Sequence, residues 1–318
     1  MKYAVNASAF EREIIALAST WAASQRVALV TLINIEGNAP YPVGAQMLVA
    51  ESGQFAGQIT GGCAEQAIAD HAVVAIKEQV NGQERYGLDS RYFDIQLPCG
   101  SGIDVYFETG LDASEYLDMA NRLAAREVIE WEIDAELGCF KKTFLPTPIL
   151  VVAGQGPIVQ ALAKLAQLSG FAILIIAQND ATLDQCESAG LTAHRLDTID
   201  LEDLPTDPYC AFISLFHEHD LETPLFTRLL PRNWFYFGAL GSRRTQQKRC
   251  AELANNGVPA ALIKKIHGPV GLNIGANTPE QIAVSTLAHV IQVHNLLLSS
   301  ESTNQLEPIQ GVKVDKAS

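Results

Sequence analysis

Four short apolar segments constrain the fold of the second half of the chain. They read ILVVAGQG (149–156), FAILIIA (171–177), CAFISLF (210–216) and WFYFGAL (234–240), and helical patterns separate them. Continuous apolar runs of this length are typical of strands that are buried on both faces of a parallel sheet. The alternation therefore predicts a Rossmann-like domain, a doubly wound parallel sheet with helices on both faces.

The first half lacks this regular alternation, and we expect a mixed α/β domain there. Helices are predicted over 10–24, 63–80 and 113–125, and strands over 27–35, 46–50, 103–108 and 128–133. Glycine, two lysines and two prolines within 138–148 indicate a linker, and the polar sequence after 300 indicates a disordered tail. The predicted organisation is an α/β domain (1–137), a linker (138–148), the Rossmann-like domain (149–300) and the tail (301–318).

Length and charge limit the class of protein. A chain of 318 residues fits two domains of ordinary size. The formal net charge is −14, and the acidic residues are spread along the chain. This weighs against a surface for nucleic acid or for an anionic membrane. An anionic ligand therefore requires a local positive pocket.

Cysteines and apolar segments indicate the compartment. The six cysteines lie far apart, without a C-x-x-C pair, which suits reduced thiols in a cytoplasmic protein. We interpret IIALASTWAAS (14–24) as an amphipathic helix and not as a signal peptide. No stretch is expected to reach the apolar length that spans a bilayer.

In an open parallel sheet, ligands bind beyond the carboxyl ends of the strands. Four segments follow the apolar strands directly, and they read GQGP (154–157), QND (178–180), HEHD (217–220) and GSRR (241–244). We expect all four to line one crevice.

The glycine loop is a candidate phosphate site. Gly154 and Gly156 precede a predicted helix, so backbone N–H groups can approach a phosphate. The third glycine of the dinucleotide-binding pattern is missing, because Val159 stands there, and Asp180 arrives late for a ribose contact. NAD(P) binding and a purely structural turn both remain open.

The second candidate anion site follows the last apolar strand. Ser242, Arg243 and Arg244 combine a hydroxyl and two guanidinium groups at the start of a predicted helix, which suits phosphate. A solvated helix face is the alternative, and it fits Lys248 and Arg249 better than the first two arginines.

Two histidines are candidate ligands with open alternatives. His217 begins HEHD, which supplies metal-binding side chains but is also a common way to start a helix. His267 lies in a loop before the last helix, where it either faces the crevice or is packed.

Two cysteines of the first half are flanked by glycines, and they raise a question of chemistry. Cys63 begins a predicted helix, where unpaired N–H groups and the helix dipole favour a thiolate, and Cys99 lies in a loop before a strand. A thiolate binds a soft metal or carries sulfur as a persulfide, whereas a buried cysteine is a small hydrophobe. The flanking glycines, which permit close approach of a ligand, are Gly61, Gly62, Gly100 and Gly102.

Several long motifs, in the same order along the chain, resemble the XdhC/CoxI family, the accessory proteins of xanthine dehydrogenase and related molybdenum hydroxylases. They are GNAPYPVGAQMLV (37–49), GQITGGCAE (57–65), LPCGSGIDVYFE (97–108), GALGSRR (238–244) and IHGPVGLNIGANTPEQIAVSTLAHVI (266–291). The sequence departs from the family pattern at Tyr41, where an arginine is common, at Phe216, at Asn273, and in the GQGP loop, which lacks a histidine.

The resemblance implies a chaperone for the molybdenum cofactor. Such a protein binds the pyranopterin, protects it while its terminal oxo ligand is exchanged for sulfide, and passes it to apo xanthine dehydrogenase or a related hydroxylase. A cysteine desulfurase is a further expected partner, and a homodimer is common. In this sequence Cys63 or Cys99 would bind the molybdenum end and Arg243 and Arg244 the phosphate, while Glu65 either caps its helix or hydrogen-bonds the pterin.

Two other functions remain open. One is an NAD(P)-dependent oxidoreductase that uses the Rossmann-like domain, and the other is a docking scaffold that holds no cofactor. The sequence contains no complete catalytic constellation, which favours a maturation chaperone over an enzyme.

Overall fold

The computed structural model describes residues 14–93, 95, 97, 100–136, 138–216, 219–301 and 305–307. These residues form two compact units, which divide between Pro146 and Thr147. The first unit holds the described residues up to Pro146 together with 305–307, and the second unit runs from Thr147 to Glu301.

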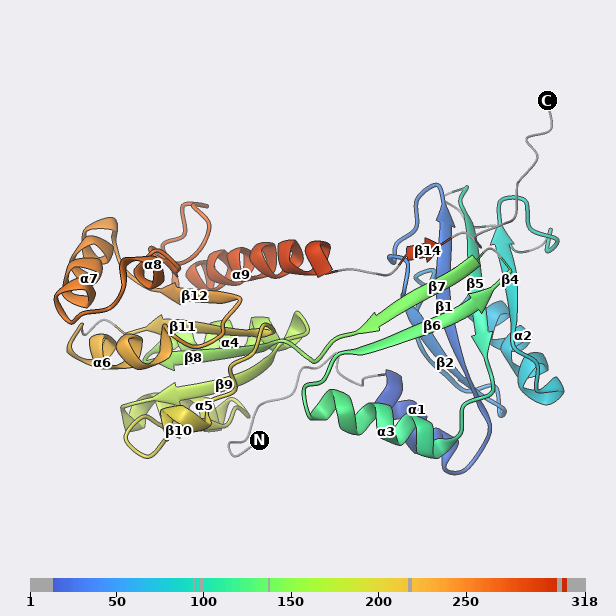
Figure 1. The fold of residues 1–318 in the computed structure, drawn as a ribbon, viewed down its shortest axis with the longest axis horizontal. Helices are drawn as coiled ribbons and strands as arrows, with labels where there is room; N and C mark the ends of the chain where they lie inside the picture. Colours follow the sequence, from blue (N-terminus) through green and yellow to red (C-terminus); the bar gives the residue numbers. More distant parts are fainter. Residues whose placement is uncertain are drawn as a thin grey trace. The chain divides into compact units, whose positions relative to one another are not determined.

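The first unit is built on a five-stranded antiparallel sheet of order β3-β2-β1-β5-β4 (Figure 1). One face is covered by α2, whose apolar residues pack with alternate residues of β1, β2 and β5. The opposite residues of β1 and β2 pack against α1 and α3. The bounds are α1 Ile14–Ala22, β1 Val27–Glu36, β2 Gln46–Ala50, β3 Phe55–Gly57, α2 Glu65–Glu78, β4 Gly82–Gly87, β5 Gly102–Glu108 and α3 Ala113–Ala124.

A second, three-stranded sheet corrects the linker prediction for 138–148. It has the order β14-β7-β6, with β6 at Ile129–Ala135, β7 at Gly138–Phe144 and β14 at Gln305–Glu307. The side chains of Phe140 and Phe144 are buried and provide the apolar face of β7, so the two lysines that suggested a linker belong to a strand. Residues 305–307, within the predicted tail, pair with β7, and the remainder of 302–318 lies outside the described residues.

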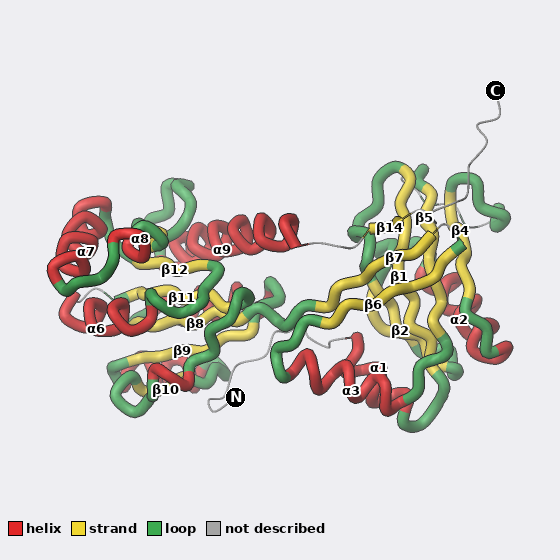
Figure 2. Tube along the Cα trace, in the orientation of Figure 1, coloured by secondary structure: helices red, strands yellow, loops and turns green. Residues whose placement is uncertain are grey.

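The second unit confirms the predicted doubly wound parallel sheet. Its six strands are parallel and have the order β10-β9-β8-β11-β12-β13 (Figure 2). The order reverses between β8 and β11, which is the switch point where ligands of such sheets bind. The bounds are β8 Ile149–Gly154, β9 Ala172–Ala177, β10 Ala193–Arg195, β11 Cys210–Leu215, β12 Tyr236–Ala239 and β13 Ile266–His267.

Helices cover both faces of this sheet. One apolar cluster joins one face to α6 and α7, and a second joins the other face to α4, α5 and α9. The bounds are α4 Pro157–Leu168, α5 Asp180–Ser188, a 3-10 turn Leu201–Asp203, α6 His219–Leu229, α7 Arg243–Asn255, α8 Ala260–Ile263 and α9 Pro279–Glu301.

Helix α9 corrects the expectation that no stretch has the length and apolar character to span a membrane. Within residues Pro279–Leu298, a window of 18 residues reaches a mean hydropathy of 1.2. Ala283, Leu287 and Val290 of this helix are buried against α4 and the sheet, and the core helix of a globular domain often meets the same criterion. This single helix is therefore weak evidence for a membrane span.

Arg249 of α7 is not on a solvated helix face, as the sequence suggested, but is buried. Its guanidinium forms a bidentate ion pair with Glu222 of α6, with Nη2–Oε2 at 2.9 Å and Nε–Oε2 at 3.0 Å, and both side chains are 2% exposed. Nη2 also donates to the carbonyl of Leu240 at 2.7 Å, and the Ser214 hydroxyl donates to Glu222 at 2.5 Å. This network fastens α7 to α6 and to the end of β12.

Arg249→Met should destabilise the protein by about 3–5 kcal/mol, because it removes the cation that neutralises a buried carboxylate. The free energy of unfolding from urea denaturation measures the effect. Lys248→Met, at the exposed neighbouring position, is the matched control and should change it by less than about 0.5 kcal/mol. Equal effects of the two substitutions would contradict the structural role of the ion pair.

Candidate functional site

The turn before α2 is held by one carboxylate. Glu65 is 5% exposed, and its Oε1 accepts from the N–H groups of Ile59 at 3.0 Å and Thr60 at 2.7 Å. Its Oε2 accepts from the Thr60 hydroxyl at 2.5 Å, the Gly62 N–H at 2.8 Å and the Ala64 N–H at 3.3 Å. Glu65 therefore closes the turn that precedes its own helix.

The same contacts fix the charge of Glu65. Burial alone opposes ionisation, but the hydrogen bonds from Thr60 and from the backbone outweigh it and lower the pKa of Glu65 from 4.5 to about 2. The carboxylate is ionised at neutral pH. A hydrogen bond from a pterin N–H group to this carboxylate stays a prediction, and the carboxylate oxygens already accept from five protein donors.

Cys63 lies at the tip of this turn and is exposed. Gly61 and Gly62 precede it with φ of +75° and +101°, a backbone conformation that favours glycine. The N–H groups of Gly62 and Ala64, on either side of Cys63, donate to Glu65 and so are not available to the thiol. An open approach to the thiol and the start of α2 remain as features that suit a ligand.

A narrow apolar crevice adjoins Cys63. Its walls include Pro40, Leu97 and Ser101, and its volume is about 20 Å³, which has room for roughly one water molecule. Cys99 lies outside the described residues. Leu97 and Ser101, which flank the second glycine-flanked cysteine motif, line this crevice together with Cys63.

In the second unit, Arg243 lines a pocket of about 430 Å³ at the carboxyl end of β12. The opposite wall is the loop Pro269–Ala276, whose Val270 N–H donates to the carbonyl of Ala239 at 2.9 Å. Ser242 caps α7 by accepting from the Thr245 N–H at 3.1 Å. Arg244 is exposed and is not among the lining residues, so the structure brings one of the two arginines to the pocket.

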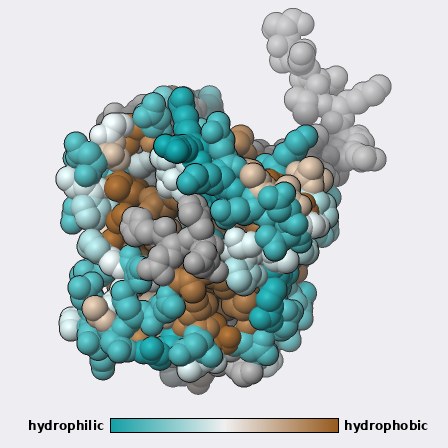
Figure 3. All heavy atoms as spheres, turned by 90° about the vertical axis from the view of Figure 1, so that its left-hand side faces the viewer, coloured by the Kyte–Doolittle hydropathy of each residue, from teal (hydrophilic) through white to brown (hydrophobic). Residues whose placement is uncertain are grey.

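The strands of this sheet end on the side of the second unit that Figure 3 faces. Hydrophobic residues gather in the middle of this view, and hydrophilic residues surround them. The pocket of Arg243 has the same mixed character, since Leu240, Leu272, Ile274 and Ile282 are among its lining residues. The sequence did not identify residues 269–276 as pocket residues. The glycines and the proline of this segment do predict a loop.

The glycine loop after β8 has limited capacity for a dinucleotide. Gly154 packs against Leu215, where an added Cβ would approach within 2.6 Å, and Gly156 has φ of +87° with open space around it. The Gly156 N–H donates to the Thr182 hydroxyl at 2.9 Å, and Asp180 pairs with Arg195. The groups expected to bind phosphate and ribose are thus engaged within the protein.

The histidines have different outcomes. His217 lies outside the described residues. The ring of His267 stacks on Tyr236 with centroids 4.4 Å apart and lies edge-on to His289 at 4.9 Å, and burial together with His289 lowers the pKa of His267. His267 is packed and does not line the Arg243 pocket. Within the described ranges, no three His, Cys, Asp or Glu residues form a group suited to a metal ion.

Comparison with known proteins identifies the family. The model of the XdhC Rossmann domain matches residues 150–290, and that of the XdhC and CoxI family matches residues 20–87. The molybdenum cofactor insertion chaperone PaoD of Escherichia coli is 31% identical over 296 residues, which cover 88% of this chain and 86% of PaoD. The chain belongs to the XdhC/CoxI family.

Two further proteins are similar to this chain, one in sequence and one in fold. A Bacillus subtilis protein described as a probable xanthine dehydrogenase subunit is 26% identical, and the match covers 84% of this chain and 93% of that protein. A crystal structure described as a xanthine dehydrogenase from Bacillus halodurans has a TM-score of 0.71 with 24% identity, covering 91% of this chain and 98% of that chain. At this level of identity the crystal structure shows a shared fold.

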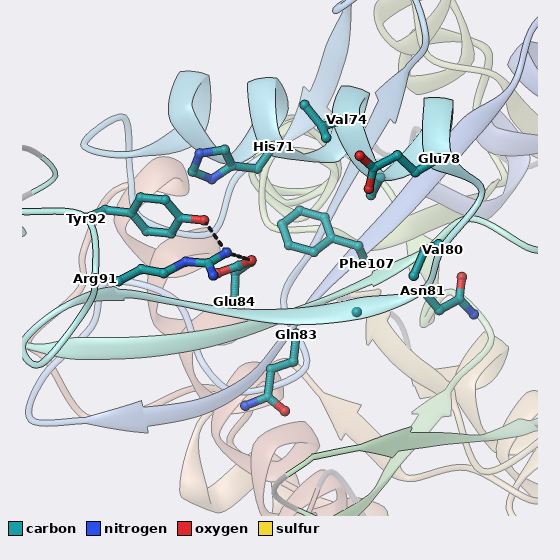
Figure 4. Close-up of a pocket in the computed structure, with 12 residues that line it drawn as sticks. His71, Val74, Glu78, Val80, Asn81, Gln83, Glu84, Arg91, Tyr92 and Phe107 are labelled. Carbon is teal, nitrogen blue, oxygen red and sulfur yellow. Dashed lines mark hydrogen bonds and ion pairs between the residues drawn. The ribbon is translucent and has the colours of Figure 1, made fainter.

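This XdhC/CoxI protein also has a pocket that sequence reasoning missed, between α2 and β4 (Figure 4). Its volume is about 270 Å³. The ring of Tyr92 stacks on His71 with centroids 4.4 Å apart. Arg91 pairs with Glu84, and its guanidinium donates to the Tyr92 hydroxyl at 2.8 Å. These contacts hold the start of the 91–101 segment against α2.

Glu65→Gln should destabilise the protein by about 2–3 kcal/mol at neutral pH, because an amide group cannot accept all the donors of the turn. The wild-type contribution is complete above the unfolded pKa of 4.5 and is lost as the pH falls toward the folded pKa of about 2. The stability difference between wild type and variant should therefore shrink below about pH 4.5.

Urea denaturation of both proteins at about pH 7 and about pH 3 measures this difference. Glu78→Gln, at an exposed position in the last turn of the same helix, is the matched control. A difference that stays constant with pH would show that the charge of Glu65 does not hold the turn.

Proposed function

We propose that this protein binds the molybdenum cofactor, supports its sulfuration and delivers it to apo xanthine dehydrogenase or a related molybdenum hydroxylase. The observation that carries the proposal is the exposed thiol of Cys63, presented by a turn that Glu65 closes. The relationship to PaoD, a molybdenum cofactor insertion chaperone, supports it. The relationship to a probable component of xanthine dehydrogenase supports the class of client enzyme.

The thiol provides the chemistry for the metal end of this cargo. Thiolate is a soft ligand that suits a molybdenum–dithiolene group, and the same sulfur can carry a persulfide. Exposure makes Cys63 accessible both to the cofactor and to a sulfur donor, for which a cysteine desulfurase is the proposed partner. Cys99, from the second glycine-flanked motif, is the proposed second thiol.

The pocket of Arg243 provides the chemistry for an anionic end. A guanidinium beside the start of α7 and the glycine-rich loop 269–276 is suited to a phosphate group. The two sites lie on different units, so each is proposed on its own geometry. We further propose that the protein forms a homodimer.

Cys63→Ser should abolish stoichiometric binding of the molybdenum cofactor, because a hydroxyl is a poor ligand for a soft metal. The experiment incubates the purified protein with the cofactor, separates bound from free, and quantifies molybdenum and pterin. Cys99→Ser is tested in parallel, and Cys250→Ser, at a half-buried cysteine of the second unit, is the control.

Retention of full binding by both Cys63→Ser and Cys99→Ser would contradict the thiolate role. A wild-type protein that binds no cofactor but binds the apo-hydroxylase would be a docking scaffold.

Arg243→Gln should weaken cofactor binding about tenfold or more and reduce its dependence on salt, because a charged hydrogen bond to phosphate is lost. Arg244→Gln removes a neighbouring charge that does not line the pocket and is the matched control. Affinity is measured at low and high ionic strength. Equal losses for the two variants would show a general charge effect instead of a phosphate site.

A further inference from the structure

A second pocket of the first unit lies beside the crevice of Cys63. It has a volume of about 390 Å³, within the range of small-molecule sites. It is an open pocket lined by the connection between β4 and β5, including Leu88, Asp89, Phe93, Leu97 and Ser101. We call it the loop pocket.

The loop pocket and the Cys63 crevice share two walls, the side chains of Leu97 and Ser101. The crevice itself, at about 20 Å³, is too small for a ring system. A ligand whose reactive end meets Cys63 must therefore place its bulk elsewhere, and the loop pocket is the adjoining space of sufficient size.

The loop pocket exposes apolar surface that the rest of the unit does not cover. Phe93 is 87% exposed and Leu88 is 45% exposed. An aromatic ring in this position is available to stack on a planar heterocycle, and such stacking is a common basis for binding nucleobases. The exposed Phe93 therefore favours a flat aromatic ligand.

Asp89 adds a polar group that suits one edge of such a ligand. It is exposed, has a left-handed φ of +58°, and its side chain makes no hydrogen bond to the residues that the structure describes. A carboxylate accepts two parallel N–H donors. The pyrimidine ring of a pterin presents such a pair, the ring N3–H and the 2-amino group.

Arg85 holds the loop that carries Asp89. Its Nε donates to the Leu88 carbonyl at 2.8 Å, and its Nη1 donates to Asp104 of β5 at 2.9 Å. Its Nη2 pairs with Glu36 of β1. Arg85 thereby ties the loop at Leu88 to β5 and β1, so the carboxylate is presented from a supported backbone.

We propose that the loop pocket binds the pterin ring system of the molybdenum cofactor, with Phe93 stacked on the ring and Asp89 bound to its pyrimidine edge, while the metal end faces Cys63. This inference rests on the proposed function and names a recognition site for the organic part of the cargo. It assigns the binding of ring and metal to different side chains of one unit.

The test uses free pterin, 2-amino-4-oxopteridine, which lacks both metal and phosphate. Quenching of its fluorescence is measured during titration with the full-length protein. Wild type should quench with saturation, and Phe93→Ala should bind about tenfold more weakly because stacking is lost. Asp89→Asn should also bind about tenfold more weakly, because an amide offers one acceptor and one donor group to two donors.

Matched controls lie on α3 of the same unit. Leu117→Ala replaces another exposed apolar residue, 52% exposed, and Asp118→Asn another exposed carboxylate. Both should leave quenching unchanged. Phe93 and Asp89 are exposed, so their variants should fold, and circular dichroism with the thermal midpoint checks this.

Binding of the intact cofactor distinguishes a failure of the proposed function from a failure of the loop pocket. Failure of wild type to bind intact cofactor would overturn the proposed function. Normal cofactor binding by Phe93→Ala and Asp89→Asn, with no saturable quenching of free pterin by wild type, would overturn the loop pocket and leave the proposed function intact. Loss of hydroxylase binding in Phe93→Ala without any change in pterin affinity would also overturn it, since Phe93 would then be a docking residue.

Discussion

The buried carboxylate of Glu65 is the interaction on which the candidate thiol site depends. An ionised group at 5% exposure is unfavourable unless donors surround it, and here the turn residues 59–64 supply those donors. Because Gly61 and Gly62 adopt positive φ, the backbone can curl around the carboxylate. The same curl leaves Cys63 at the surface, so an exposed thiol is a consequence of satisfying a buried charge.

A comparable constraint acts in the second unit. The pair of Arg249 and Glu222 fixes α7 against α6 and the end of β12. Arg243 is the first residue of α7, the helix that this ion pair anchors. The ion pair therefore anchors the helix whose first residue lines the pocket together with the loop 269–276.

The sequence predicted those features of the fold that local residue patterns determine. The four central strands of the parallel sheet, β9, β8, β11 and β12, are apolar runs, so the doubly wound fold followed from short windows, whereas the short edge strands β10 and β13 carry no such pattern. The strand β7 was mistaken for a linker, because Lys141 and Lys142 obscured the apolar face made by Phe140 and Phe144. Burial of Arg249 depends on Glu222, 27 residues away, and the role of Glu65 depends on the curl of the turn. Neither can be read from residue type and spacing.

The side chains of the proposed sites are exposed to solvent, which suits delivery of a ligand better than catalysis. Cys63 is exposed, Phe93 is largely exposed, and Arg243 is an exposed residue on the rim of its pocket. Ligand sites that retain their ligand usually enclose most of its surface. On the proposed function, the open contacts for the metal and the ring in the first unit would recognise the cofactor through several weak interactions. An apo-hydroxylase that encloses the same groups could displace them one at a time, without first opening a closed site.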